Sequence, residues 1–418
     1  MTAKTLSNFI VGAFFIKLFT AALSLAVYGL YARLLGAEGF GLLALTLSLG
    51  LLMGGVAKLG LENVMLRFGP QFNAENLSRL YGVGIAIVII SNFVIILFFV
   101  FFLEALVSWF NITGLEVMLP FIAVNALLNS LLAVNVAVLN ALLKARLSLI
   151  FSGLMSNTLI LLNLLIFKPG NPVDVIYIVL WCYALTLLIT YCVSFYYCLP
   201  KFNGLKKLPI TTLFRANQRF FIISISAIVT QQLASVLVAK YADLAEVGLL
   251  SIALKIAMLL SYPLLAVNAV CAPRYAKLSS QANIYKIKEL ANKTRWVLTL
   301  LASVGLFLIF IFIEPVLLLL GQEYVAAAMY VKILAIGQWI NLSTGSVVVI
   351  LLMTGHERLH KYQNLVITIL FLILLWLTIP IYGAVAAAVL TAISISAKNL
   401  LSSYYVNKRV FKVNINDF

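Results

Sequence analysis

The hydrophobic positions of this chain run together in long stretches, and short polar interruptions separate them. Cutting at the interruptions leaves apolar runs of about 20 residues, the length that a helix needs to cross the hydrocarbon core of a bilayer. Each backbone N–H and C=O must be satisfied within such a segment, so the runs are predicted to be spanning helices rather than barrel strands. The pattern predicts twelve spans: 9–32, 41–66, 81–103, 117–143, 149–167, 174–198, 219–240, 247–271, 296–313, 325–353, 363–381 and 383–404.

The composition supports this interpretation. Hydrophobic residues make up 64% of the 418 positions and charged residues only 10%, and the mean hydropathy is +1.11. A water-soluble domain of this size could not stay in solution with that balance. The expected fold class is therefore an all-α, multi-pass membrane protein with about twelve transmembrane helices.

The charges predict an orientation. With both termini in the cytoplasm, 21 of the 29 Lys and Arg residues lie in inner segments, whereas eight of the thirteen acids lie in outer ones. Cytoplasmic loops of membrane proteins are enriched in Lys and Arg, so both termini are predicted to be cytoplasmic and the membrane to be the plasma (cell inner) membrane. The surplus of basic residues, 29 against 13 acidic ones, is then explained by the orientation of the chain in the membrane. No nucleic-acid partner is expected.

The chain also divides near its middle. The polar stretch 199–218 is predicted to link two six-helix halves, a lobe of residues 1–205 and a lobe of residues 206–418. Ala32-Arg33 and Gly41-Leu42-Leu43 in the first half are echoed by Ala239-Lys240 and Gly248-Leu249-Leu250 in the second, as in the internal repeats of transporters. No outer loop exceeds about 15 residues, so an activity is expected inside the bundle.

Once the charges at the span ends are assigned to the loops, six charged residues remain within the predicted spans: Lys17, Lys58, Glu62, Lys255, Lys332 and Lys398. A lysine at mid-bilayer costs about 2.5–3.5 kcal/mol on insertion scales, so such residues usually face a water-filled cavity or a partner. Lys58 and Glu62 are four residues apart and could neutralise each other, or Glu62 could carry a proton. Lys332 and Lys398 lie near span ends and could extend to the interface. Lys17 and Lys255 lie deeper, where lining a cavity is the favoured interpretation.

A cationic cavity suits a phosphate-bearing ligand and would repel cationic drugs. Lysine neutralises phosphate oxygens as a point charge, and the attraction grows where water is partly excluded. Neutral polar residues of the spans could hydrogen-bond sugar hydroxyls, or could equally join helix to helix. These residues are Asn125, Asn129, Gln231, Gln232, Asn268, Gln338 and Asn341.

Two other motifs have simpler explanations. His356-Glu357-Arg358-Leu359-His360 fits the H-E-x-x-H zinc pattern, but these are the only two histidines and no third ligand follows nearby, so neither a metal nor a cofactor is expected. Gly50 and Gly54 form a G-x-x-x-G motif, which we interpret as a close contact between helices of the same chain. No P-loop sequence is present, and the chain is not expected to be an enzyme.

Several short segments resemble polysaccharide-biosynthesis flippases of the Wzx type, the O-antigen translocases. They are the run Ala32-Arg33-Leu34-Leu35-Gly36-Ala37-Glu38-Gly39-Phe40-Gly41, Leu59-Gly60-Leu61-Glu62-Asn63 with Arg67-Phe68, Glu246-Val247-Gly248-Leu249 with Ala253-Leu254-Lys255, Ala272-Pro273-Arg274, and Gly321-Gln322-Glu323-Tyr324. Each segment alone is a weak match, and the order of the segments along the chain makes the resemblance specific.

The resemblance implies the V-shaped, two-lobed fold of the multidrug/oligosaccharidyl-lipid/polysaccharide (MOP) exporter superfamily, with a central cavity bordered by the first, second, seventh and eighth helices. Lys17, Lys58, Lys240 and Lys255 fall on those helices and would bind substrate, with Arg33 at the outer mouth and Glu62 as ion-pair or coupling partner. The implied substrate is an undecaprenyl-pyrophosphate-linked oligosaccharide, moved from the cytoplasmic to the periplasmic leaflet. Membrane lipid, a polysaccharide polymerase and chain-length proteins are the implied partners.

Other functions stay open at this stage. Teichoic-acid, exopolysaccharide and lipid II exporters of the same superfamily are the nearest alternatives, although a lipid II flippase usually has fourteen spans. A multidrug cation antiporter would be expected to carry an acid in its first helix, where this chain has only Lys17. A membrane-embedded polysaccharide polymerase would be expected to carry a large outer loop with basic residues, which is not found here.

Overall fold

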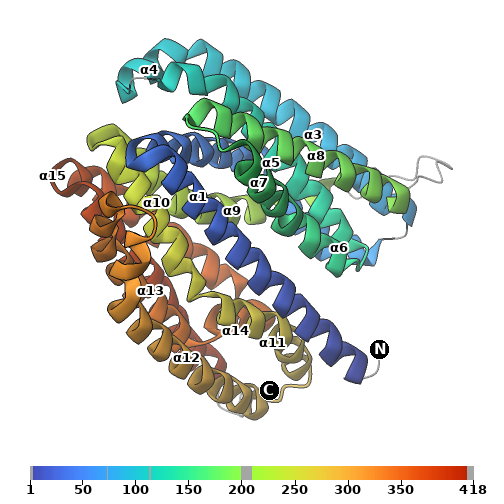
Figure 1. Ribbon diagram of the computed structural model, residues 1–418. Helices are drawn as coiled ribbons and strands as arrows, with labels where there is room; N and C mark the ends of the chain where they lie inside the picture. Colours follow the sequence, from blue (N-terminus) through green and yellow to red (C-terminus); the bar gives the residue numbers. More distant parts are fainter. Residues whose placement is uncertain (1–2, 73, 113, 199–209, 412–418) are drawn as a thin grey trace. The chain divides into compact units, whose positions relative to one another are not determined.

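The computed structural model describes residues 3–72, 74–112, 114–198 and 210–411. Its contacts form two compact units, Phe19–Gly248 and Met1–Leu18 with Leu249–Phe418 (Figure 1). Each regular element in the described ranges is a helix, which confirms the all-α prediction. The predicted boundary between the two halves falls at residue 205, outside the described ranges, and the division into two six-helix lobes stays a prediction.

The unit Phe19–Gly248 contains the greater part of the long helix α1 (Ala3–Ala57) and the start of α10 (Leu244–Leu259). Between them lie α2 (Leu61–Phe68), η1 (Gly69–Gln71), α3 (Ala74–Phe101), α4 (Leu103–Phe110), α5 (Leu115–Ala141), α6 (Ala145–Leu149), η2 (Ile150–Leu154), α7 (Met155–Phe167), α8 (Pro172–Cys198) and α9 (Ile210–Tyr241).

The other unit contains the rest of α10 and the C-terminal helices. These are α11 (Tyr262–Ser280), α12 (Ile284–Leu318), η3 (Gln322–Ala326), α13 (Ala327–Thr344), α14 (Val347–Met353), α15 (Glu357–Tyr405) and η4 (Val406–Phe411). In this unit α13 packs against both α12 and α15. Gly337 permits that approach, because a Cβ there would lie 2.8 Å from the backbone of Ala392 on α15.

The helix lengths agree with twelve spans. Among the described residues, eight helical stretches are long and apolar enough to cross a membrane, and the bent pair α10–α11 makes a ninth. Two of the eight, Phe15–Ala57 with 43 residues and Glu357–Phe411 with 55, are about twice the length of one crossing. Each is broken at a glycine with positive φ, Gly36 at 67° and Gly383 at 54°, a conformation that disfavours other residues. Helix α9 covers the remaining predicted span, 219–240, so every predicted span has a helical counterpart.

Helix α5 lies at the centre of the unit Phe19–Gly248, where it packs against α2, α3 and α8 (Figure 1). Buried Met65, Tyr81, Val134 and Val138 form the core that joins α2, α3 and α5. The Tyr81 hydroxyl donates a hydrogen bond to the side-chain oxygen of buried Asn135, so a polar group inside the apolar core is satisfied.

Gly50 and Gly54 face α5, as the intrachain interpretation of their motif predicts. A Cβ on Gly54 would lie 2.7 Å from the carbonyl oxygen of Ala126, and a Cβ on Gly50 would collide with the side chain of Asn125. The absence of side chains at these two positions therefore sets the distance between α1 and α5.

Candidate functional site

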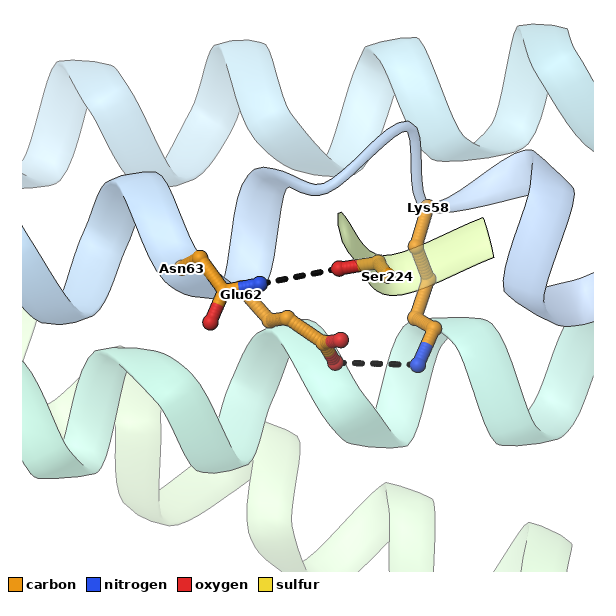
Figure 2. Close-up of polar contacts among 4 residues, drawn as sticks. All are labelled: Lys58, Glu62, Asn63 and Ser224. Carbon is orange, nitrogen blue, oxygen red and sulfur yellow. Dashed lines mark hydrogen bonds and ion pairs between the residues drawn. The ribbon is translucent and has the colours of Figure 1, made fainter. Parts of the chain in front are cut away.

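The first candidate site is the turn between α1 and α2, where two of the predicted site residues meet. Leu59 and Gly60 have positive φ values of 49° and 78° and turn the chain between the helices. Across this turn the Lys58 ammonium donates to the Glu62 carboxylate at 2.9 Å (Figure 2). The side chains are 16% and 27% exposed, so the pair is shielded from most solvent. The structure therefore pairs the two charges that the four-residue spacing could bring together, and the role of Glu62 in substrate or proton transport stays a prediction.

A second polar contact fixes α2 beside that turn. The Asn63 amide donates to the Ser224 hydroxyl of α9 at 2.9 Å, and Ser224 is buried (Figure 2). Sequence reasoning did not identify this contact, because it joins positions 161 residues apart and neither residue carries charge. Glu62 thus lies on a short helix that is tied to α9, and Lys58 lies in the turn before that helix.

The second candidate site is a pocket in the same unit, with a volume of about 580 Å³. Its polar lining includes Glu38 from α1, Asn111 from the turn after α4, and Lys240 and Asp243 from the end of α9 and the turn that follows. Phe110, Ile112 and Leu244 are among its apolar lining residues. Sequence reasoning selected Lys240 but treated Glu38 and Asp243 only as outer acids, since nothing in the pattern showed that these turns meet.

Lys240 does not extend freely into this pocket. Its ammonium donates to the backbone carbonyl of Trp109 and lies 5.3 Å from the centre of the Trp109 ring. The residue therefore connects the end of α9 to α4 through a hydrogen bond and a cation–π contact. Arg33 is exposed on α1, three residues before the Gly36 break, and is not among the residues that line the pocket.

Lys17 and Lys255 belong to the other unit. Lys17 on α1 is exposed, and Lys255 on α10 is half-buried. Arg33, Lys58, Glu62 and Lys240 all belong to the unit Phe19–Gly248. The cationic chamber that would combine the two sets of residues stays a prediction.

The two remaining lysines of the spans lie in different surroundings. Lys332 donates to Glu314 of α12 at 2.7 Å, which agrees with a side chain that extends toward the outer end of its helix. Lys398 is half-buried on α15, where its backbone carbonyl accepts a hydrogen bond from the Gln363 side chain.

Several neutral polar residues of the spans are used within the protein. Asn125 is fully buried and donates to the Leu47 carbonyl at 3.4 Å, and the Asn129 amide donates to Asn125. Gln338 accepts from Asn341 one turn away on α13. For Asn125 the structure therefore supports a contact between helices rather than an open site.

The histidine pair lies at the start of α15. His356 precedes the helix and its Nδ1 lies 3.1 Å from the Thr354 hydroxyl, whereas His360 is buried beside Asn364. Among the described residues, no group of three His, Cys, Asp or Glu side chains is placed to hold a metal ion.

Comparisons with known families agree with the resemblance. A family model described as "Polysaccharide biosynthesis protein" matches residues 7–279, more than half of the chain, and the MatE model matches residues 221–377. No curated protein sequence matches the chain.

Solved structures share the fold. A "Lipid II flippase MurJ, inward closed conformation" matches with a TM-score of 0.72 and 14% identity, over 95% of this chain and 87% of the other. An inward-facing MATE family multidrug transporter of the MOP superfamily matches with a TM-score of 0.70 and 13% identity, over 94% of both chains. The expected MOP-type membrane fold is confirmed.

Proposed function

Because the chain belongs to the polysaccharide biosynthesis protein family, we propose that it is a flippase that carries an undecaprenyl-pyrophosphate-linked oligosaccharide, an O-antigen or related repeat unit, from the cytoplasmic to the periplasmic leaflet. The observation that carries the proposal is the family match over residues 7–279 in a chain with a MOP-type transporter fold. The same family match and fold make the chain a multi-pass membrane exporter of the MOP superfamily.

The charges of the spans support a pyrophosphate-bearing substrate. Lys17 is exposed on α1, where a substrate could reach it, and Lys255 is half-buried on α10 within an apolar stretch of the sequence. An ammonium in a partly dehydrated site attracts phosphate oxygens more strongly than one in bulk water. The polyprenyl tail would stay in lipid while the head group crosses through the protein.

Alternating access would complete the transport cycle, with the substrate entering from the cytoplasmic side. An anion that leaves a negative-inside cell gains about 2.3 kcal/mol per charge per 100 mV, so outward movement needs no coupling ion. The Lys58–Glu62 pair offers a place for proton coupling if the cycle uses one, because protonation of Glu62 would release Lys58.

Replacement of Lys17 or Lys255 by Ala tests the proposal in cells. Loss of one charge-assisted hydrogen bond costs about 1.5–3 kcal/mol, so surface polysaccharide should fall by about tenfold or more. Lys288→Ala is the matched control, because Lys288 is exposed on α12 outside the apolar part of that helix. Immunoblots should show equal membrane levels of all variants, and full surface polysaccharide in both the Lys17→Ala and the Lys255→Ala cells would refute the phosphate site.

A further inference from the structure

The pocket lined by Glu38, Asn111, Lys240 and Asp243, called here the outer pocket, is built from three chain turns that are held together. Close backbone contacts join the α1 break to the start of α10, since a Cβ on Gly248 would lie 2.5 Å from the Ala37 carbonyl oxygen. Lys240 connects the third turn through Trp109. The pocket is therefore a preformed feature of the unit Phe19–Gly248.

The charges of the outer pocket do not suit phosphate. The lining contains two acidic residues, Glu38 and Asp243, and one basic residue, Lys240, whose ammonium already donates to the Trp109 carbonyl. An anion entering the pocket would meet a net negative lining and would be repelled. Lys240 is therefore better explained as a structural link than as a pyrophosphate ligand.

The same lining suits a neutral ligand rich in hydroxyl groups. Ionised carboxylates accept hydrogen bonds from hydroxyl donors, and the Asn111 side chain can both donate and accept. Phe110, Ile112 and Leu244 provide apolar surface for the C–H faces of a ring. The volume of about 580 Å³ lies within the range of small-molecule pockets.

We propose that the outer pocket binds the sugar portion of the transported lipid on the periplasmic side, separately from the cationic residues that would bind its pyrophosphate. This inference rests on the proposed function and on the predicted orientation, in which the turns carrying Glu38 and Asp243 are outer turns. The flippase then has two chemically different subsites. Lysines bind the pyrophosphate, and the carboxylates of the outer pocket select the sugar on the periplasmic side.

Equilibrium titration of the purified, full-length protein tests the inference. The probes are inorganic pyrophosphate and the free oligosaccharide that mild acid releases from the lipid-linked intermediate of the source cells. The double variant Glu38→Gln/Asp243→Asn should bind the oligosaccharide about tenfold more weakly than the wild type and pyrophosphate equally well. Glu104→Gln is the matched control, because Glu104 is an exposed acid on α4 that does not line the pocket, and it should change neither affinity.

Three outcomes would overturn the inference: no oligosaccharide binding by the wild type, unchanged oligosaccharide binding in the double variant, or weakened pyrophosphate binding in that variant.

A failure of the proposed function would give a different experimental result from a failure of the outer pocket. Transport of the intact lipid-linked oligosaccharide by wild-type protein without oligosaccharide binding would refute the outer pocket alone. A wild-type protein that moves no such lipid in vesicles would refute the flippase, whatever the pocket binds.

Discussion

Lys58 and Glu62 carry opposite charges one helical turn apart. Because both side chains are shielded from most solvent, either charge would destabilise the protein if its partner were removed. The pair is 16% and 27% exposed, so removal of one partner leaves a charge with little water around it. The i,i+4 spacing alone predicted that the two could meet. The shielding could not be predicted in this way, because it depends on helices that are distant in sequence.

Removal of either charge alone should destabilise the protein more than removal of both. Lys58→Ala and Glu62→Gln should each lower the free energy of unfolding by about 2 kcal/mol, since a hydrogen bond between charged groups is lost and one polar group stays buried. The combined variant should recover part of that loss. Thermal unfolding in detergent measures the effect.

The exposed pair Glu289–Lys293 is the matched control, with the same four-residue spacing and side chains that are 46% and 74% exposed. Exposed ion pairs contribute about 0.2–1 kcal/mol, so Lys293→Ala should change stability only slightly. Equal losses at the two pairs would contradict the claim that the Lys58–Glu62 pair is shielded.

At the scale of the elements, small residues determine where helices touch. The G-x-x-x-G motif predicted a close contact within the chain, and the contact of Gly50 and Gly54 with α5 confirms it. The twelve spans were predictable because bilayer thickness fixes the length of an apolar run. The joining of spans into single long helices was not predictable, because the breaks depend on the φ values of Gly36 and Gly383.

A methyl group at Gly54 should weaken the contact between α1 and α5. Gly54→Ala would place a Cβ 2.7 Å from the Ala126 carbonyl oxygen, and overpacking of this kind costs about 1–3 kcal/mol. Gly82→Ala is the matched control, since Gly82 lies on α3 with no atom within 4 Å of an added Cβ. It should be neutral or stabilising by about 0.5–1 kcal/mol. Thermal unfolding of the two variants compares them, and equal stability would refute the close packing.

At the scale of the whole molecule, the sequence predicted the fold class and its family more fully than the site. Charge counts identified Lys17 and Lys255 because an ammonium in an apolar run is conspicuous. The outer pocket was missed because Glu38, Asn111 and Asp243 come from separate turns, and turns contain acids and amides for many reasons. Only the folded unit shows that these three residues line the same pocket.

The central claim is transbilayer movement of a lipid-linked oligosaccharide, and transport in reconstituted vesicles tests it most directly. The undecaprenyl-pyrophosphate-linked oligosaccharide of the source cells is placed in one leaflet, and its arrival in the other is followed with an impermeant reagent. Vesicles that contain the folded protein should move the lipid faster than protein-free vesicles. Equal rates in the two preparations, with the protein verified as folded by its thermal unfolding, would contradict the account.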